Sequence, residues 1–253
     1  ASNNTAVGRF ALVSNTTGSA STAVGFGALD VNTTGDQNTA CGNNTLGANT
    51  TGQYNTAVGT QALINSTTAN NNTALGAFAL LSNTTGDLNT AVGYSAMYNS
   101  TNGDRNVAVG YETLYNLAAD QGDTYHTCIG WKAGHNITTG TQQTHVGANA
   151  GISVTTGNSN TFMGYNAGSS TDTGQLNTAV GRAVFGSNTS GSNNTALGSG
   201  SLNSNTTASN NTGVGYNSLA SNTTGDDNAA VGSGALDANT TGSHLTALGY
   251  GSL

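Results

Sequence analysis

The stretch Asn55-Thr56-Ala57-Val58-Gly59 decides the fold, because it returns along the whole chain with small changes. It recurs unchanged at residues 89–93 and 177–181. Successive copies of its glycine lie 17 residues apart, except Gly110 and Gly130, which are 20 residues apart. Internal repetition at a fixed period indicates a repeat architecture. We therefore interpret the chain as a stack of about fifteen coils.

The consensus of one coil, N-T-A-V-G-x-x-A-L-x-x-N-T-T-G-x-x, favours strands and turns over helices. Paired-helix repeats need a longer period, of roughly 30 residues or more. Short T-A-V runs between Asn and Gly are typical of strands between turns. We predict an all-β parallel β-solenoid with two or three short strands per coil. We expect one repeat array over residues 1–253, with an irregular seam and a three-residue insertion at residues 116–126.

Apolar residues stand at two neighbouring positions of each predicted strand. We number positions from the repeat glycine: position −1, directly before it, is always apolar, position −2 is usually Ala, and position +4 is usually Leu. Consecutive side chains point to opposite faces of a strand, so both faces are apolar. One face can fill the coil, and the other needs a cover, most simply a neighbouring chain. The predicted structural ladder at position −1 contains Val7, Val24, Val58, Leu75, Val92, Val109, Val180, Leu197 and Val231.

Three coils after the insertion exchange large and small residues at two positions. At position −2 they carry Cys128, His145 and Phe162, and at position +4 they carry Gly134, Gly151 and Gly168. Protein interiors keep a nearly constant packing density, so a gain in volume at one place needs a loss nearby. We therefore predict that positions −2 and +4 are neighbours in one packed layer.

Composition limits the partners of the chain. Charged residues make up 6% of it, and the formal net charge is −7. A nucleic-acid surface needs clustered Lys and Arg, and the whole chain has four of these residues. We expect no nucleic-acid partner. No long apolar run is present, so we expect no insertion into a membrane either.

No motif predicts catalysis, a cofactor or a metal site. His126 and Cys128 form an H-x-C pair that could suit zinc, but no second pair stands at ligand spacing. We favour an interpretation in which Cys128 and His145 fill a packed column. Aspartates such as Asp87 follow turn glycines, which is typical of solvated turn residues rather than of a glycosidase pair. We expect that the chain is not an enzyme.

Aromatic residues recur at position +1, and three successive coils carry Tyr94, Tyr111 and Trp131 there. An exposed ladder of aromatic rings could stack on sugar rings, so these three residues are candidates for facing a ligand. The alternative is stacking between coils that supports the sheet, and we favour it.

The Asn-Thr-Ala-Val-Gly unit followed by Ala-Leu resembles two groups of repeats over the whole chain. One is the N-T-A-V-G-Y-x-A-L repeat of phage tail fibres and related proteins, which often precedes an intramolecular-chaperone peptidase domain. The other is the head repeat of YadA-like trimeric autotransporter adhesins, which is shorter than 17 residues. The resemblance implies a left-handed roll, a homotrimer, and a location outside the cell, on the cell surface or on a virion.

These observations favour a structural and adhesive fibre segment that binds itself, as a trimer or end to end. It could also bind a cell-surface glycan or receptor. Polar caps that would stop end-to-end contact are not seen, so we expect a segment of a longer fibre or a unit capped by partners. An ice-binding solenoid is the alternative, because Thr is abundant, although T-x-T is nearly absent. A polysaccharide-degrading tailspike is the third hypothesis.

Overall fold

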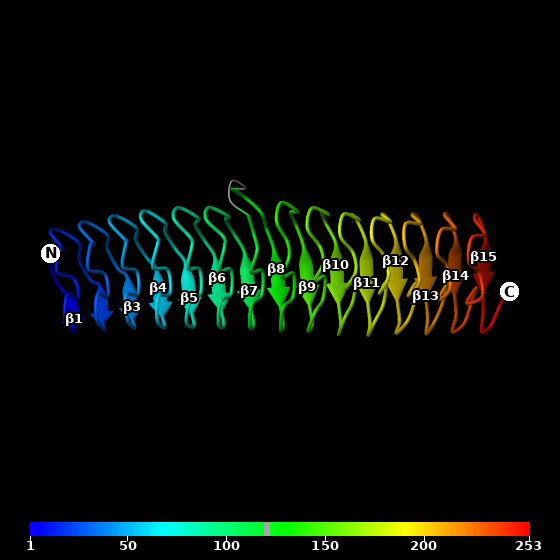
Figure 1. Cartoon of the computed structure of the whole chain (residues 1–253), viewed down its shortest axis with the longest axis horizontal. Coiled ribbons are helices and arrows are strands. Elements are labelled where there is room, and N and C mark those ends of the chain that lie inside the picture. The colour runs from blue at the N-terminus through cyan, green and yellow to red at the C-terminus, as the bar shows by residue number, and fades with distance from the viewer. Residues whose placement is uncertain (119–121) are drawn as a thin grey trace. The chain divides into compact units, whose positions relative to one another are not determined.

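The computed structural model describes residues 1–118 and 122–253, and it is an all-β parallel β-solenoid (Figure 1). The chain divides into two compact units, residues 1–126 and 127–253, and each is described by itself below. Ala119, Asp120 and Gln121, which belong to the predicted insertion, lie outside the described residues. The single array over the whole chain stays a prediction.

Every strand has three residues and ends directly before a repeat glycine. The strands of the first unit are β1 (Thr5–Val7), β2 (Thr22–Val24), β3 (Thr39–Cys41), β4 (Thr56–Val58), β5 (Thr73–Leu75), β6 (Thr90–Val92) and β7 (Val107–Val109). Those of the second unit are β8 (Thr127–Ile129), β9 (Thr144–Val146), β10 (Thr161–Met163), β11 (Thr178–Val180), β12 (Thr195–Leu197), β13 (Thr212–Val214), β14 (Ala229–Val231) and β15 (Thr246–Leu248). Over residues 1–118 and 122–253 no helix is long and apolar enough to span a membrane.

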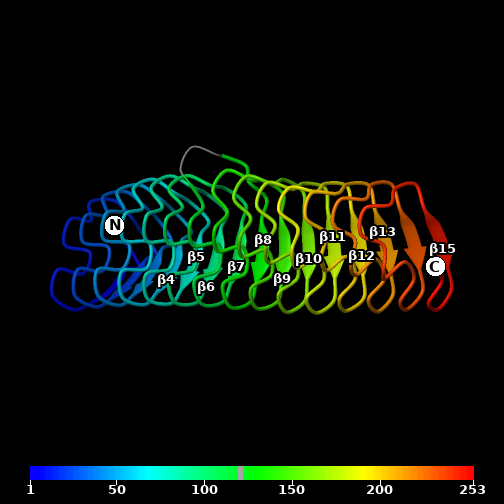
Figure 2. The same cartoon turned by 45° about the vertical axis from the view of Figure 1, so that its right-hand side comes forward.

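Neighbouring strands within a unit are parallel, and each residue lies opposite the residue 17 positions later. Val58 lies opposite Leu75, and Leu75 lies opposite Val92. The arrows of each unit form one face of its stack, and loops close the other sides (Figure 2). The predicted stacking of residues 17 apart is confirmed.

The prediction of two or three strands per coil is wrong, because each described coil has one strand. Outside the strand the chain bends repeatedly at residues with positive φ, such as Gln61 (57°), Leu63 (51°) and Asn71 (58°) in successive parts of one turn. Such bends prevent a second strand in the coil. Backbone hydrogen bonds nevertheless join successive coils at these bends. The amide of Leu63, for example, donates to the carbonyl of Ala79 over 3.0 Å.

The repeat glycine is required both by its backbone conformation and by the space around it. Gly59 has a φ of 130°, where L residues are strongly disfavoured. A Cβ added there would lie 2.6 Å from the carbonyl oxygen of Gly76 in the next coil. The glycines thus form a column of close backbone contacts, which explains why this residue marks the period.

Leucine at position +4 also takes a left-handed conformation, at a cost that its burial offsets. A non-glycine residue in this region costs roughly 1–2 kcal/mol. Leu63 is fully buried, and burial of a leucine side chain contributes about 1.5–3 kcal/mol. A large apolar side chain is therefore needed at this position for the conformation to be stable.

The interior of each regular coil has an apolar half and a polar half. The apolar half consists of Ala at positions −2 and +3 and Leu at position +4. The polar half consists of two columns of buried asparagine, at positions −4 and +7, which bond between coils. In the first column Asn55 Nδ2 donates to the Ala69 carbonyl over 2.8 Å. In the second, Asn49 Nδ2 donates to Asn32 Oδ1 over 2.8 Å, so that asparagines of successive coils form a ladder.

The predicted contact between positions −2 and +4 is confirmed in the second unit. A Cβ added to the glycine at +4 would lie within 2.8 Å of the large side chain at −2, for Gly134 against Cys128, Gly151 against His145 and Gly168 against Phe162. The two positions meet because the chain wraps around the coil interior between them. The rings of His145 and Phe162 continue the layer between coils, since they stack at 5.1 Å with 7° between their planes.

Candidate functional site

The outward face of the strands carries an apolar column at position −1. From β2 to β15 the middle residue of each strand is buried, whereas the residue at −1 is half-buried or exposed. All residues of the predicted ladder lie in this column. Six of its members are between 36% and 40% exposed: Val58, Leu75, Ile129, Met163, Val180 and Val231. Side chains of this kind, repeated from coil to coil, form an apolar stripe along each unit, and contiguous exposed apolar side chains are typical of interaction surfaces.

Threonine at position −3 lies beside this stripe on the same face of the strands. It is replaced only in β7, by Val107, and in β14, by Ala229. Among the described residues, none of the strands β1 to β15 carries Asp, Glu, Lys or Arg. The outward strand face is therefore uncharged, although the whole chain has a formal net charge of −7.

The aromatic candidates of the first unit stack on each other. The rings of Tyr94 and Tyr111 have centroids 5.4 Å apart and an interplanar angle of 10°. A second pair, Tyr98 and Tyr115 at position +5, stacks in the same way at 5.0 Å and 9°. This is the expected stacking between coils, and it covers one face of each ring. Binding of a sugar by this pair stays a prediction.

Glu112 modifies the chemistry of this aromatic pair. Its hydrogen bond with the Tyr111 hydroxyl raises the pKa of that phenol, because the carboxylate favours the protonated form. Burial and the neighbouring Tyr98 raise the pKa of Tyr115 as well. Tyr111 and Tyr115 are therefore neutral at physiological pH and can act as hydrogen-bond donors.

The third aromatic candidate, Trp131, belongs to the second unit and is 48% exposed. The ammonium group of Lys132 lies 5.0 Å from the centre of its ring, within the range of a cation–π contact. One ring face is thus already engaged by a charged side chain.

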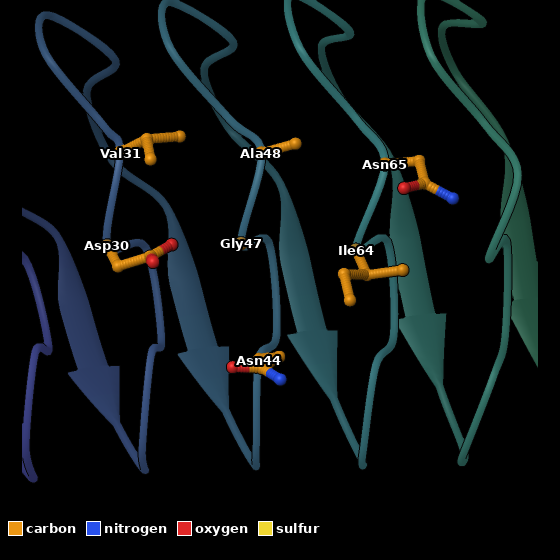
Figure 3. A pocket seen from close by; sticks show the side chains of 7 residues that line it. All are labelled: Asp30, Val31, Asn44, Gly47, Ala48, Ile64 and Asn65. Carbon is orange, nitrogen blue, oxygen red and sulfur yellow. The ribbon is translucent and has the colours of Figure 1, made fainter.

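A shallow hollow opens in the first unit where one coil has small residues at a corner. Its volume is about 390 Å³, and it is lined by Asp30, Val31, Asn44, Gly47, Ala48, Ile64 and Asn65 (Figure 3). Asp30 and Ile64 flank Gly47, since a Cβ on that glycine would lie 3.6 Å from each of them. The hollow contains no aromatic ring, and none of the sequence-predicted site residues lies in it.

The histidine and cysteine residues singled out in the sequence are packed inside the coils. Cys128 is fully buried, and burial strongly raises the pKa of its thiol, which keeps it protonated and unreactive. His145 is also fully buried and stacks on Phe162. In the part of the chain that the structure describes, no three His, Cys, Asp or Glu side chains gather as metal ligands would.

Several aspartates at position −6 bond to the backbone of a neighbouring coil. Asp36 Oδ1 accepts a hydrogen bond from the Ser19 amide over 2.7 Å, and Asp104 Oδ1 accepts one from the Asp87 amide over 2.7 Å. These carboxylates hold the turns together, as turn residues do. Sequence reasoning identified them as turn residues but missed this bond between coils.

The chain matches no protein-family model, no curated protein and no solved structure. Its function is therefore argued from its own surface and from the repeat unit described above.

Proposed function

We propose that this chain is a structural and adhesive fibre segment that associates with copies of itself through the outward strand face. The observation that carries the proposal is the apolar column at position −1, present in every coil and partly exposed. Burial of apolar surface stabilises association by about 25 cal/mol per Å² before the costs of binding. The column therefore offers a favourable contact that is repeated along each unit.

A second copy of the chain fits this face better than an unrelated protein. The face repeats once per coil, at the roughly 4.8 Å spacing of neighbouring strands. Only a partner with the same spacing can make the same contact at every coil, and another copy has that spacing by construction. The lack of charged residues in the strands also removes repulsion between identical faces.

We further propose that the association is a homotrimer, and that the segment lies outside the cell, on a cell surface or on a virion. The support for these points is the resemblance of the repeat unit to fibre and adhesin repeats. Catalysis is not part of the proposal, because Asp36 and Asp104 at position −6 serve as acceptors for backbone amides.

The mass of the chain in solution tests the proposal. We expect a trimer of the 25.0 kDa chain by light scattering, and a shift toward monomer when Val58→Asp places a charge in the apolar column. Thr51→Asp is the matched control, because Thr51 is exposed and lies outside the strand. A monomer at all concentrations would rule out self-association, and a trimer unaffected by Val58→Asp would rule out this face.

The two cysteines give an independent test in the unmodified chain. Cys41 stands at position −1 of β3 and is exposed, whereas Cys128 is buried. We expect a thiol reagent to react with Cys41 rapidly in dilute monomer and at least about tenfold more slowly in the oligomer. Cys128 should react only on unfolding, which makes it the internal control. Equal reaction of Cys41 in both states would contradict the proposed interface.

One observation favours an ice-binding surface as a second candidate. Threonines at position −3 form a row with a spacing of about 4.8 Å along each unit. The neighbouring column, however, varies in size from Cys41 to Met163, which makes the face less even than a lattice-matched surface needs. Thermal hysteresis of the purified chain decides the question, since its absence excludes this candidate.

A further inference from the structure

We propose that a hollow in the second unit, between Tyr216 and Tyr250, binds one neutral pyranose ring of a glycan. The inference rests on the adhesive part of the proposed function and gives it a site. The hollow has a volume of about 200 Å³ and is lined by Tyr216, Asn217, Ser233, Gly234, Asp237, Tyr250 and Gly251. This is less than the roughly 300–1,000 Å³ of pockets for drug-sized ligands, which favours a single ring.

The two tyrosines occupy the same position in coils that are two steps apart. Both stand at position +1, and the coil between them has Ser233 there. Two coil steps are about 9.6 Å at a strand spacing of about 4.8 Å. Tyr94 and Tyr111, which are one step apart, close on each other at 5.4 Å. The missing aromatic ring at Ser233 therefore leaves a gap where the first unit has a stack.

The width of this gap suits a puckered ring. Carbon atoms in contact lie about 3.5–4.0 Å apart, so one flat ring between two aromatic planes needs about 7–8 Å. The gap of about 9.6 Å exceeds that requirement, and a chair-shaped pyranose is thicker than a flat ring. Tyr216 is 61% exposed, so its ring is accessible to the C–H groups of a sugar.

Polar groups at the edge of the gap can bond to sugar hydroxyls. Asp237 supplies a carboxylate, Asn217 an amide and Ser233 a hydroxyl. The carboxylate has about four acceptor positions, enough for two neighbouring hydroxyl groups. Its negative charge is the one full charge among the lining residues, which disfavours sialic acids, uronic acids and nucleotides.

Two glycines keep the floor of the gap free of side chains. A Cβ on Gly234 would have the Asp237 carboxylate at 3.6 Å and the backbone of Gly251 at 3.9 Å as its nearest neighbours. In the stacked coil of the first unit the equivalent position +2 carries Glu112. The absence of side chains at this position lets a ring approach the backbone.

Binding of methyl glycosides and short oligosaccharides of neutral hexoses to the full chain tests this site. Isothermal calorimetry and saturation-transfer NMR measure the affinity, and sialylated oligosaccharides and nucleoside monophosphates serve as comparison ligands. We expect a neutral hexose to bind, and Tyr216→Ala to weaken binding at least about tenfold. Ser233→Tyr should abolish it by filling the gap. Tyr54→Ala is the control and should leave binding unchanged, because Tyr54 is an exposed tyrosine of the first unit outside both aromatic sites.

Three results would overturn the inference: no neutral hexose binds at millimolar concentration, binding survives both Tyr216→Ala and Ser233→Tyr, or an acidic ligand binds more tightly. Circular dichroism on each variant shows whether the fold is kept. If Ser233→Tyr fails to fold, Tyr216→Ala and Asp237→Asn decide alone. Light scattering on the same samples separates the two proposals, because a trimer that binds no sugar refutes the site alone, and a sugar-binding monomer refutes self-association alone.

Discussion

The coils of β2 to β6 and those of β8 to β10 build the same backbone turn around different interiors. In the first set position −2 is Ala and position +4 is Leu or Met, as in the pair Ala57 and Leu63. In the second set the volume moves to position −2, as in the pair Phe162 and Gly168. The comparison teaches that side-chain volume can move from one of these neighbouring positions to the other, most fully at Phe162 and Gly168.

The same exchange occurs in the polar half of the coil. Position +7 is Asn or Ser in β2 to β6, as at Asn49 and Ser66, but it is apolar at Ile137 and Val154. All four side chains are fully buried. Where the asparagine ladder is absent, apolar packing fills its place. Neighbouring coils therefore carry the same kind of residue at position +7, polar in one region and apolar in the other.

The largest loss of stability is expected when a large residue at position −2 and a leucine at position +4 are placed in the same coil. Gly168→Leu adds a Leu against the Phe162 ring, which lies 2.4 Å from a Cβ at that glycine, and should cost about 3 kcal/mol. Phe162→Ala should cost about 3–4 kcal/mol through the cavity it leaves. The double variant restores the pair found in β2 to β6 and should lose about 3 kcal/mol less than the sum.

Chemical denaturation at fixed protein concentration measures this cycle. Backbone strain does not confuse the result, because Gly168 has a φ of 59° and Leu63 takes a similar value of 51°. Additive losses in the double variant would show that positions −2 and +4 do not share one volume, and the comparison would fail.

A smaller loss of stability is expected when the side-chain hydrogen bond at position −4, which both regions keep, is removed. Asn55→Ala leaves the buried carbonyl of Ala69 and the amide of Asn72 without their partner, at about 1–3 kcal/mol each. In the other region Gln143 makes the same bond, to the Gly157 carbonyl. We expect Asn55→Ala and Gln143→Ala each to cost about 3 kcal/mol in the free energy of unfolding.

Asn65→Ala is the control for the asparagine variant, because Asn65 is exposed and should cost less than about 0.5 kcal/mol. A marked difference between Asn55→Ala and Gln143→Ala would mean that the bond at position −4 supports only one of the two interiors.

The period, the register and the exchange between positions −2 and +4 could all be predicted from the sequence. Each is visible as a column of like residues, and stacking requires such columns. The face that turns inward could not be predicted, because Ala57 and Val58 are both apolar. The structure puts the smaller residue inside, where two sides of the coil approach each other. The single strand per coil was missed because leucine has no intrinsic preference for the φ of 51° seen at Leu63.

The candidate binding site was missed in part for a related reason. Sequence reasoning sought consecutive aromatic residues and therefore selected Tyr94 and Tyr111, whose faces cover each other. The useful signal was an aromatic residue in every second coil, with a small residue between, as at Tyr216, Ser233 and Tyr250. Only the observed stacking distance shows which of the two patterns leaves a ring face open.

A moderate loss of stability is expected when an asparagine replaces a buried apolar residue at position +7 in the second unit. Val154→Asn buries an amide beside Ile137, which offers no acceptor of the kind that Asn32 offers Asn49, and should cost about 2 kcal/mol. Val154→Ala separates the lost volume from the buried polar group, and we expect it to be about 1 kcal/mol less destabilising. If denaturation shows Val154→Asn to be more stable than Val154→Ala, position +7 in this region accepts a polar side chain.

The smallest expected effect is a gain in stability. It comes from introducing an asparagine at position +7 in the first unit. Asn49 Oδ1 and Ser66 Oγ are buried and have no hydrogen-bond partner among the described residues, because Ser66 is too short to continue the ladder. Ser66→Asn should donate to Asn49 Oδ1 and accept from Asn83 Nδ2, as Asn49 and Asn32 do over 2.8 Å. Alanine three residues later is compatible with this, since Asn205 Nδ2 donates to the Ala208 carbonyl over 3.0 Å.

We expect Ser66→Asn to stabilise the chain by about 1 kcal/mol, which is the usual net value of a buried hydrogen bond, and thermal and chemical denaturation should agree on its sign. Ser66→Ala is the control, because it removes the unpaired hydroxyl without building the ladder. If Ser66→Ala stabilises the chain as much as Ser66→Asn, relief of one buried hydroxyl accounts for the gain. A stabilising Ser66→Asn beside a destabilising Val154→Asn would instead show that asparagine is favourable only where the coils above and below carry it too. The asparagine column then acts as a cooperative unit, and its replacement by Ile137 and Val154 is a change of the whole column rather than of single residues.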